Sequence, residues 1–537
     1  MFGTLLRSMA LALLLHAGAA QAEAPASIPP EVLEGLGSDS FSERIEAIEG
    51  LAVAGEEGAR VLEAISSREV GIVDGRAVIV RDGIVMDVGS GMIVEADPAD
   101  VSMLRVNNRV RCAVAGAEAA QILETGTDEQ RLDASRTIIG SASEALLPLF
   151  ERVIENETLP SVRDNVLQAY ARVKLDSDDA DDRLAAVEAL GLTANRGVLN
   201  LLRPFTERTN GEWVESDERV RDAAEASITA VERRVALAEN LRLAFHGLSL
   251  GSILLLAALG LAVTFGVMGV INMAHGELLM VGAYATFMVQ QLFRTHFPEI
   301  FDWYVVAAIP VAFFVAAFVG VIMERGVLRY LYGRPLESLL ATWGISLVLI
   351  QTARVTFGPQ NLEISSASWM SGSVEVMAGL SLSLSRLYVL GFSLFVLALL
   401  WLLMQRTRLG MFVRAVVQNR AMAGCVGVPT KRIDTMAFAM GAGVAGLGGL
   451  ALSQIANVGP AMGQAYIVDS FMVVVLGGVG QLAGTVTAAF GLGVFSTLLE
   501  GWTGAVVAKI LVLVFIIMFI QKRPQGIFAL KGRTADS

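Results

Sequence analysis

The second half of the chain is a series of long apolar stretches separated by short polar connections. After residue 240 we identify nine such stretches, and most are close to the ~20 residues that a helix needs to cross a bilayer. Their approximate bounds are 247–270, 276–293, 303–323, 338–356, 387–404, 434–453, 467–481, 483–500 and 504–520. The seventh and eighth are short and rich in glycine, which leaves open whether they cross the membrane or form broken, re-entrant segments. The sequence therefore predicts an α-helical polytopic membrane protein with about eight or nine transmembrane helices.

Charge divides the chain at the same place. Residues 1–250 hold 42 of the 53 acidic and 24 of the 41 basic residues, a net charge of -18, against +6 for the remainder. Neither part offers a large basic face, so the sequence excludes a nucleic-acid binder. Cys112 and Cys425 lie on opposite sides of the division. They form no ligand cluster and no disulfide framework, so we expect neither a metal nor a cofactor.

The first residues have the order of a cleavable signal peptide. Arg7 precedes an apolar run from Met9 to Leu15, and Ala20-Gln21-Ala22 follows. This run is shorter than the ~20 residues of a spanning helix, and the alternative is a short membrane anchor. We expect cleavage after Ala22, which makes residues 1–22 a signal peptide and places residues 23–240 outside the cytoplasm.

A weak pattern recurs between residues 23 and 240: an arginine, a small apolar residue three positions later and a larger residue four positions after that. The copies are Arg44/Ala47/Leu51, Arg131/Ala134/Ile138, Arg163/Val166/Tyr170, Arg183/Ala186/Leu190 and Arg221/Ala224/Ile228. Spacings of three and four keep these positions on one helical face. The pattern predicts a mostly α-helical, HEAT-like periplasmic domain. The alternative is an ordinary helical domain in an alanine-rich sequence.

Two further features of this domain bear on its structure and chemistry. Residues 70–94 hold short β-branched runs separated by Gly and Asp, which predicts a short β segment. After cleavage the domain contains no histidine, and its carboxylates stand beside arginines on predicted helix faces. That arrangement is typical of a solvated surface, and we expect no catalytic site and no enzyme activity.

The basic residues after residue 240 fall in alternate connections. With an outside N-terminal domain and nine crossings, the third connection, the fifth connection and the tail are cytoplasmic, as the positive-inside rule requires. These residues are Arg325, Arg329 and Arg334, then Arg406, Arg408, Arg414, Arg420, Lys431 and Arg432, then Lys522, Arg523, Lys531 and Arg533. The prediction is a multi-pass protein of the bacterial inner membrane with a transmembrane domain at 241–530 and a cytoplasmic tail at 531–537.

The apolar stretches contain few charged residues. Asp469, Glu500 and Lys509 lie near predicted helix ends, and no ladder of ionisable groups runs through the stretches, which argues against an ion-coupled carrier. The polar residues within or beside the stretches are mostly uncharged, which suits an uncharged or zwitterionic solute. They are Thr264, Asn272, Ser346, Gln351, Gln454 and Asn457.

Two glycine-rich spellings resemble nucleotide-binding motifs only superficially. Gly441-Ala-Gly443-Val-Ala-Gly446 lies inside an apolar stretch with no soluble strand before it, so we interpret it as close helix packing. Gly478-Val-Gly480 also lies in an apolar stretch, and the sequence contains no P-loop. The chain is not expected to bind ATP itself.

The fifth connection predicts a short helix over residues 412–424, ended by Gly427-Val-Pro429 and flanked by basic residues. Taken alone, the basic residues fit an ordinary cytoplasmic loop. The helix followed by Gly and Pro resembles the loop by which permeases of ABC importers dock a coupling helix into their ATPase. Ala423 and Gly427 take the place of that loop's Ala-x3-Gly core, and the glutamate usual in the broader motif is absent.

A wider resemblance covers roughly residues 245–530. Three segments together resemble the permeases of the branched-chain amino acid ABC transporter family. They are Ile271-Asn-Met-Ala-His275-Gly-Glu277-Leu-Leu-Met-Val-Gly282-Ala-Tyr284, the fifth connection, and Val475-Leu-Gly-Gly-Val-Gly480-Gln-Leu-Ala-Gly484. Residues 352–363, residues 368–372 and the long N-terminal extension are similar to the urea-transporter branch.

The resemblance implies a permease subunit of an ATP-driven importer whose most favoured solute is urea. Its partners would be a second permease subunit, two cytoplasmic ABC ATPase subunits, a periplasmic solute-binding protein and membrane lipid. The residues of the coupling loop would be Arg414, Arg420, Ala423, Gly427, Pro429 and Lys431. An unresolved alternative within the class is a permease for branched-chain amino acids or short amides.

Amide and hydroxyl side chains suit a path for a small uncharged solute. Asn272 and His275 are the leading candidates, with Gln351, Gln454 and Asn457 as further ones. The alternative is that Asn272 and His275 are a buried hydrogen-bonded pair bracing the first turn. By the helix count this turn lies on the inner side, with Glu277 at the cytoplasmic interface. An alternative of another class is a passive channel with an external sensory domain, which would work without an ATPase.

Overall fold

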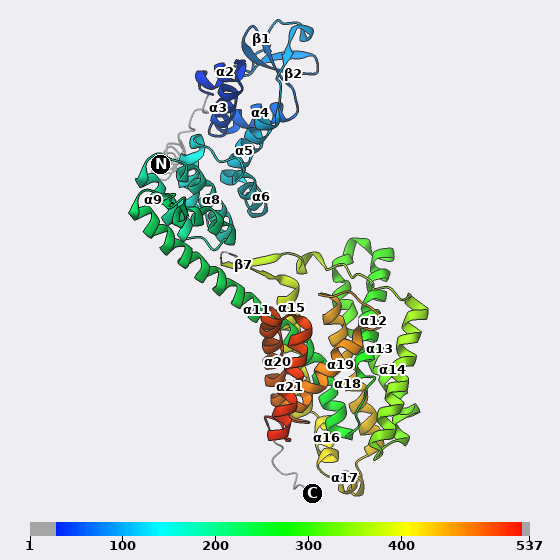
Figure 1. Ribbon diagram of the computed structural model, residues 1–537. Coiled ribbons are helices and arrows are strands. Elements are labelled where there is room, and N and C mark those ends of the chain that lie inside the picture. The colour runs from blue at the N-terminus through cyan, green and yellow to red at the C-terminus, as the bar shows by residue number, and fades with distance from the viewer. Residues whose placement is uncertain (1–27, 378, 529–537) are drawn as a thin grey trace, which may run out of the picture. The chain divides into compact units, whose positions relative to one another are not determined.

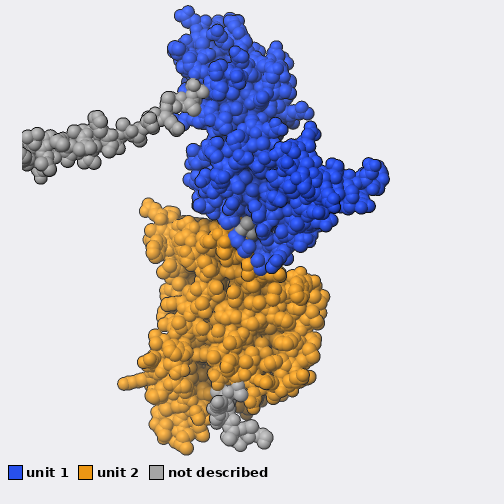
Figure 2. All heavy atoms as spheres, turned by 90° about the vertical axis from the view of Figure 1, so that its left-hand side faces the viewer, with its two compact units in different colours: residues 1–238, 377–379 blue, residues 239–376, 380–537 orange. Residues whose placement is uncertain are grey.

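The computed structural model describes residues 28–377 and 379–528, and it is mostly helical (Figure 1). The chain separates into two compact units, which Figure 2 distinguishes by colour. The first unit comprises the residues up to Ala238 together with Met377–Gly379, and the second comprises the remainder. The predicted signal peptide at 1–22 and the tail at 531–537 lie outside the described residues.

The first unit is built from short helices that pack against their neighbours in sequence. Its helices are α2 (Pro30–Gly37), α3 (Phe41–Leu51), α4 (Gly55–Ser66), α5 (Asn108–Thr125), α6 (Asp128–Ile138), α7 (Leu147–Asn156), α8 (Pro160–Leu175), α9 (Ala180–Gly191) and α10 (Leu199–Leu202). The long helix α11 (Glu218–Met268) begins in this unit and continues into the second. Each helix buries one apolar face, which it cannot do alone.

A small antiparallel sheet lies between α4 and α5. Its strands are β1 (Val70–Val73), β2 (Arg76–Arg81), β3 (Ile84–Asp87) and β4 (Ser102–Met103), in the order β3-β2-β1-β4. Asp74-Gly75 and Asp82-Gly83 connect the first three strands, and all four residues have positive φ. Two-residue Asp-Gly loops of this kind match the twist of a hairpin, so the sequence sets this register locally.

All five copies of the arginine pattern lie on helices, namely α3, α6, α8, α9 and α11. The small residue is buried in every copy, at Ala47, Ala134, Val166, Ala186 and Ala224. In three copies the arginine donates a hydrogen bond to the backbone carbonyl six residues earlier. These bonds join Arg44 to Ser38, Arg183 to Ser177 and Arg221 to Glu215. The arginine thus holds in place the segment that leads into the helix to which the arginine belongs.

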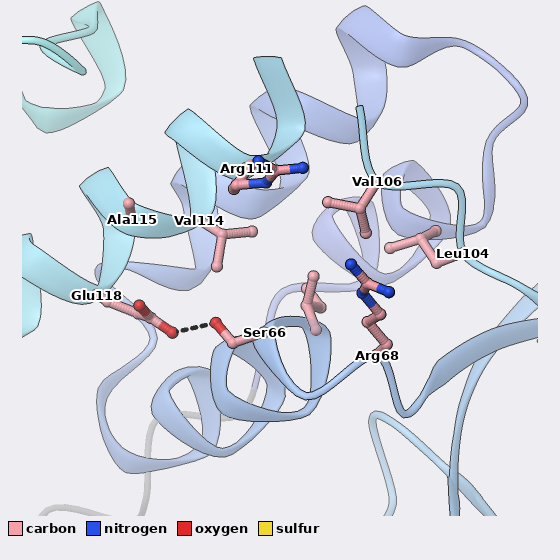
Figure 3. Close-up of a pocket in the computed structure, with 9 residues that line it drawn as sticks. Ser66, Arg68, Leu104, Val106, Arg111, Val114, Ala115 and Glu118 are labelled. Atoms are coloured by element: carbon pink, nitrogen blue, oxygen red, sulfur yellow. Dashed lines mark hydrogen bonds between the residues drawn. The ribbon is translucent and has the colours of Figure 1, made fainter. Parts of the chain in front are cut away.

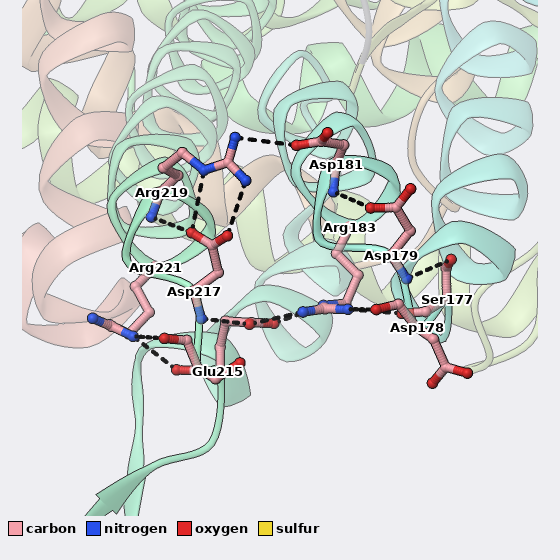
Figure 4. Close-up of polar contacts among 10 residues, drawn as sticks. Ser177, Asp178, Asp179, Asp181, Arg183, Glu215, Asp217, Arg219 and Arg221 are labelled. Atoms are coloured by element: carbon pink, nitrogen blue, oxygen red, sulfur yellow. Dashed lines mark hydrogen bonds and ion pairs between the residues drawn. The ribbon is translucent and has the colours of Figure 1, made fainter.

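Figure 4 shows how Glu215 joins Arg183 and Arg221. Arg183 also binds the Glu215 carboxylate through Nε at 2.8 Å and through Nη2 at 3.0 Å. Glu215 is only 5% exposed. The Arg183 guanidinium holds the pKa of the Glu215 carboxyl below its usual range. The pair ties α9 to the segment that leads into α11.

We predict that Glu215→Gln lowers the free energy of unfolding around α9 and the start of α11 by about 2 kcal/mol at pH 7, because it removes a mostly buried charged partner. Glu215 has a depressed pKa in the folded state. Its contribution is therefore present above the unfolded value of about 4.5 and is lost as pH falls through the folded value. Hydrogen exchange of the full chain at pH 7 and at lower pH measures this.

Glu207→Gln is the matched control, because Glu207 is exposed and its side chain has no hydrogen bond or ion pair within the described residues. Equal exchange in the two variants at pH 7 would contradict the assignment.

The second unit is a helical bundle. After α11 its helices are α12 (His275–His296), α13 (Tyr304–Gly326), α14 (Pro335–Phe357), α15 (Leu384–Arg406), α16 (Arg408–Gln418), α17 (Arg420–Cys425), α18 (Thr430–Ser453), α19 (Met462–Gly477), α20 (Leu482–Thr503) and α21 (Ala505–Lys522). The short strands β7 (Ser373–Met377) and β8 (Leu380–Ser383) precede α15, and the pair β5 (Arg208–Thr209) and β6 (Glu212–Trp213) belongs to the first unit.

Seven helices of the described residues are long and apolar enough to cross a membrane, where the sequence predicted eight or nine. They are α11, α13, α14, α15, α18, α20 and α21. The other two predicted stretches form α12, which carries several polar residues, and α19, which has only 16 residues. A sharp break with positive φ at Gly478 and Gly480 separates α19 from α20.

Helix α18 is the centre of the bundle (Figure 1). Its most apolar part is 89% buried, against 22% for α15 and 17% for α21. The predicted packing role of its glycines agrees with their surroundings, because a Cβ on Gly446 or Gly449 would overlap backbone atoms of α13 or α12. Gly282 of α12 in turn lies directly against the Gly446 carbonyl. Small residues thus let these helices meet backbone to backbone.

We predict that Gly282→Ala separates α12 from α18 and destabilises the bundle by about 3 kcal/mol, because neither backbone can move aside without repacking. Thermal unfolding of the purified full chain measures the effect. Gly344→Ala is the control, because a Cβ at Gly344 of α14 would meet nothing within 4 Å. Indistinguishable melting of both variants would show that the contact is unimportant.

Candidate functional site

The connection between α11 and α12 is an irregular segment of six residues. Helix α11 ends at Met268, and Gly269 takes a positive φ of 64° that ends the helical path. The Asn272 side-chain oxygen then accepts a hydrogen bond from the Ala274 backbone N–H at 3.0 Å. This local turn starts α12 at His275. The Thr342 hydroxyl of α14 accepts a further bond from the Met273 N–H at 3.2 Å.

This connection ends deep inside the bundle. His275 Nε2 donates a hydrogen bond to the Ala257 carbonyl at 2.9 Å, and Ala257 lies eleven residues before the last residue of α11. The chain therefore turns back along α11 before α12 begins. Glu277, which the sequence places at the cytoplasmic interface, is only 1% exposed and is therefore enclosed by protein. The side of the membrane on which the turn lies stays a prediction. Irregular backbone is tolerated at this depth because protein surrounds it.

Four buried polar atoms gather along the first part of α12 without hydrogen-bond partners in the described structure. They are Asn272 Nδ2, His275 Nδ1, Glu277 Oε2 and the Tyr284 hydroxyl. The other Glu277 oxygen accepts from the Ser346 hydroxyl at 2.8 Å, and Tyr284 stacks on Phe357 with ring centroids 4.4 Å apart. Because residues 277 and 284 are seven apart, they share the face of α12 that meets α14. Buried polar groups are ordinarily paired, so this concentration marks a candidate binding region.

A second polar cluster lies near the other end of α12. The Tyr304 hydroxyl is 2.7 Å from the Ser365 carbonyl oxygen and 3.2 Å from Gln454 Oε1. Gln290 donates to the same Ser365 carbonyl at 2.9 Å. Since Gln290 lies fifteen residues beyond His275, about 22 Å of helix separates the two clusters. Gln454 thus belongs to a different group from Asn272.

The five residues predicted for the solute path are not brought together. Asn272 and His275 share the irregular turn, Gln454 is in the second cluster, and Gln351 and Asn457 are exposed on the chain's surface. Glu277 and Tyr284 also belong to the first cluster and are not among the residues predicted for the path. Their spacing of seven on one helix is the signal in the sequence that could have found them.

The predicted coupling loop forms two helices, α16 and α17, and the single helix predicted over 412–424 is wrong. Asn419 interrupts it because its side-chain oxygen caps α17 by accepting from the Met422 N–H at 2.9 Å. Ala423 is buried, Gly427 has a positive φ of 89° and Pro429 stands at the start of α18. Lys431 is exposed in the first turn of α18.

Ion pairs fasten α17 to the bundle. Arg420 binds the buried Asp434 of α18 through two hydrogen bonds and lies 4.9 Å over the Tyr332 ring. Next to Asp434, the Thr435 hydroxyl donates to the buried Glu324 of α13 at 2.7 Å. Truncating one partner of such a pair leaves the other buried and unpaired, which is costly. The Arg420–Asp434 pair thus holds α17 against α18.

A cavity of about 500 Å³ opens beside this loop. It lies between the last turn of α11, α15, α16 and the turn that precedes α20, and Gln405, Arg414, Gln418 and Gln481 supply its polar groups. The guanidinium of Arg414 also donates to the Met404 carbonyl. The predicted coupling residue Arg414 is thus part of the wall of this cavity.

A protein-family model described as the permease component of the branched-chain amino acid transport system matches residues 243–521. The chain belongs to this family. The branched-chain amino acid permease LivH of Salmonella typhimurium is 28% identical over 291 residues, which cover 53% of this chain and 93% of LivH. LivH of Escherichia coli has the same identity and coverage, and BraD of Pseudomonas aeruginosa is 27% identical over 288 residues, or 52% and 93%. No solved structure is significantly similar.

Membership of the branched-chain amino acid permease family assigns the second unit a role. Such proteins are membrane subunits of ABC transporters and work with ATPase and binding-protein partners. The match begins at residue 243 and leaves the part of the first unit up to Ala238 outside it. The candidate binding cluster, the α12–α18 contact and the two-helix loop all lie within the matched residues.

We predict that Glu277→Gln reduces transport about tenfold or more without changing the melting temperature, because it converts an unpartnered acceptor into a donor and leaves an oxygen for Ser346. Uptake by cells carrying the complete transporter measures this. Ser346→Ala is the comparison, since it alters the bonded oxygen only. Normal uptake by the Glu277 variant would show that Glu277 is not part of the solute path.

Proposed function

We propose that this chain is the permease subunit of an ATP-driven importer for a small solute without net charge. The observation that carries the proposal is the buried cluster at the start of α12, where the Asn272 Nδ2 donor and the Glu277 Oε2 acceptor have no hydrogen-bond partner among the described residues. A helix that begins inside a membrane bundle is a common place for a solute site, because its N-terminus and the unwound backbone before it offer polar groups.

The chemistry of the cluster suits a solute that carries both hydrogen-bond donors and an acceptor. Urea carries several N–H donors for the Glu277 oxygen and one carbonyl for the Asn272 amide. An α-amino acid would present an ammonium and a carboxylate to the same two groups. Urea is favoured because residues 352–363 and 368–372 resemble the urea-transporter branch. Branched-chain amino acids, for which the similar permeases are named, are the alternative.

The loop of α16 and α17 is proposed to receive the ATPase. Met422 is 62% exposed and Val426 is 73% exposed, although both are apolar, while Ala423 between them is buried. An exposed apolar tip on a firmly held helix suits insertion into a groove of a partner. We propose that Arg414, Arg420, Gly427, Pro429 and Lys431 form the remainder of this docking loop.

A continuous set of contacts links that loop to the cluster. Arg420 holds α17 to Asp434 of α18, and the glycines of α18 lie against α12 close to Glu277 and Tyr284. We propose that ATP hydrolysis in the partner shifts α17 and α18 together and so changes the surroundings of the α12 cluster.

The orientation follows the sequence. We propose that the first unit is a secreted, HEAT-like periplasmic domain, that the coupling loop and the C-terminus are cytoplasmic, and that a second permease subunit completes the pathway. The alternation of basic connections supports this topology.

The test is uptake of labelled urea at low concentration by cells that carry all partners, with excess leucine as competitor. We expect uptake that needs an active ATPase, that Met422→Asp abolishes and that Met422→Leu retains. Competition by leucine would show that branched-chain amino acids are the solute and that urea is not. Urea uptake that persists with an inactive ATPase would overturn the importer and establish a passive channel.

A further inference from the structure

The first unit contains a cavity that the transport function does not use. It lies between the end of α4 and the first three turns of α5 and has a volume of about 500 Å³ (Figure 3). Small-molecule sites are commonly cavities of about 300–1,000 Å³ in which apolar walls are combined with a few polar groups that fix the ligand's orientation. This cavity has both kinds of wall, and the polar part is the larger.

Two arginines supply its charge. Arg68 follows α4 directly, with a positive φ of 59°, and Arg111 is in the first turn of α5. Neither guanidinium has a hydrogen bond or an ion pair within the described residues, whereas many other arginines of this unit pair with carboxylates. A cation near a helix N-terminus is unfavourable unless an anion accompanies it.

The sequence around Arg111 offers no such anion, and Glu69 beside Arg68 is paired with Arg81. Residues 101–117 contain Arg105, Arg109 and Arg111 but no acidic residue, within a part of the chain whose net charge is -18. The first acidic residue on this face of α5 is Glu118, two turns beyond Arg111, and its carboxylate accepts a 2.5 Å bond from the Ser66 hydroxyl. The guanidinium groups at the positive end of the cavity are therefore available to bind an anionic ligand.

The remaining wall is apolar. Ile65 and Val114 are 2% and 4% exposed, and Leu104 and Val106 close the same side. Figure 3 shows Val114 between Arg111 and the Ser66–Glu118 pair. A ligand here meets guanidinium groups at one end and aliphatic side chains along its body.

We propose that this cavity binds a small organic carboxylate with an apolar body. Guanidinium groups match the two oxygens of a carboxylate in geometry and charge, and the partly exposed Val106 and Ala115 cover part of the hydrocarbon body. The ligand is a plain carboxylate or an α-amino acid. If the ligand is an α-amino acid, the Glu118 carboxylate accepts a hydrogen bond from the ligand's ammonium group.

The test is calorimetric titration of the purified full chain in lipid nanodiscs with 4-methylpentanoate, with its uncharged amide and with leucine. The acid and its amide share one hydrocarbon body, so their difference reports the carboxylate alone. We expect the acid to bind at least about tenfold more tightly than the amide, as charge-assisted hydrogen bonds require.

Arg68→Gln combined with Arg111→Gln should weaken binding of the acid about tenfold or more. Arg105→Gln is the matched control, because it removes the same charge from the same stretch but does not line the cavity. All three side chains are exposed, so the variants should fold, and melting curves check this. Leucine binding more tightly than the acid supports an amino acid as the ligand, and weaker leucine binding supports a plain carboxylate.

Three results would overturn the proposal: no heat of binding for the acid or leucine, equal affinity for acid and amide, or unchanged affinity in the double arginine variant. The last result separates this cavity from the membrane bundle, because a solute bound by the α12 cluster would be unaffected by Arg68 and Arg111.

Discussion

The backbone contact between α12 and α18 is the constraint on which the membrane unit depends. Gly282 and Gly446 meet where neither has a side chain, and Gly449 lies against the Leu279 carbonyl about one turn of α12 from the irregular connection. This approach holds the start of α12 inside the bundle, next to Ala257 of α11. Without it the polar atoms of Asn272 and Glu277 would have no fixed place among apolar helices.

The same central helix reaches the coupling loop. Asp434 in the first turns of α18 forms an ion pair with Arg420, and the adjacent Thr435 hydroxyl donates to the buried Glu324 of α13, so polar contacts hold this end of α18. Glycine packing at one end and ion pairs at the other make α18 a rigid connection. A rigid element that contacts two sites can pass a displacement from one to the other.

Much of this arrangement could be predicted from particular residues. The apolar stretches gave the helices of the second unit, and the Asp-Gly pairs at 74–75 and 82–83 gave the hairpins of the small sheet. The recurring arginine pattern marked helix positions, but its use could not be foreseen. Whether Arg183 donates to Ser177 depends on the path of the loop before the helix, and hydrophobic spacing says nothing about that path.

The remaining features could not be predicted, for a common reason. Hydropathy records how apolar a segment is and not what packs around it, so the burial of Glu277 within the bundle could not be foreseen. Gln351 and Asn457 are predicted for the solute path because they are uncharged and polar; both are exposed in the single chain, and their role stays a prediction. At the coupling loop, the helical pattern continued through Asn419, whose capping bond interrupts the helix.

The most direct measurement is the chemical accessibility of residue 272 in the assembled transporter. Cys112 and Cys425, both exposed, are first replaced by serine, and Asn272→Cys is compared with Ser249→Cys, a buried position on α11. We predict that a small polar thiol reagent labels position 272, that the transported solute protects it and that the labelling rate changes with the state of the ATPase, while position 249 stays unlabelled. Position 272 unlabelled in every state would contradict a solute path at the start of α12.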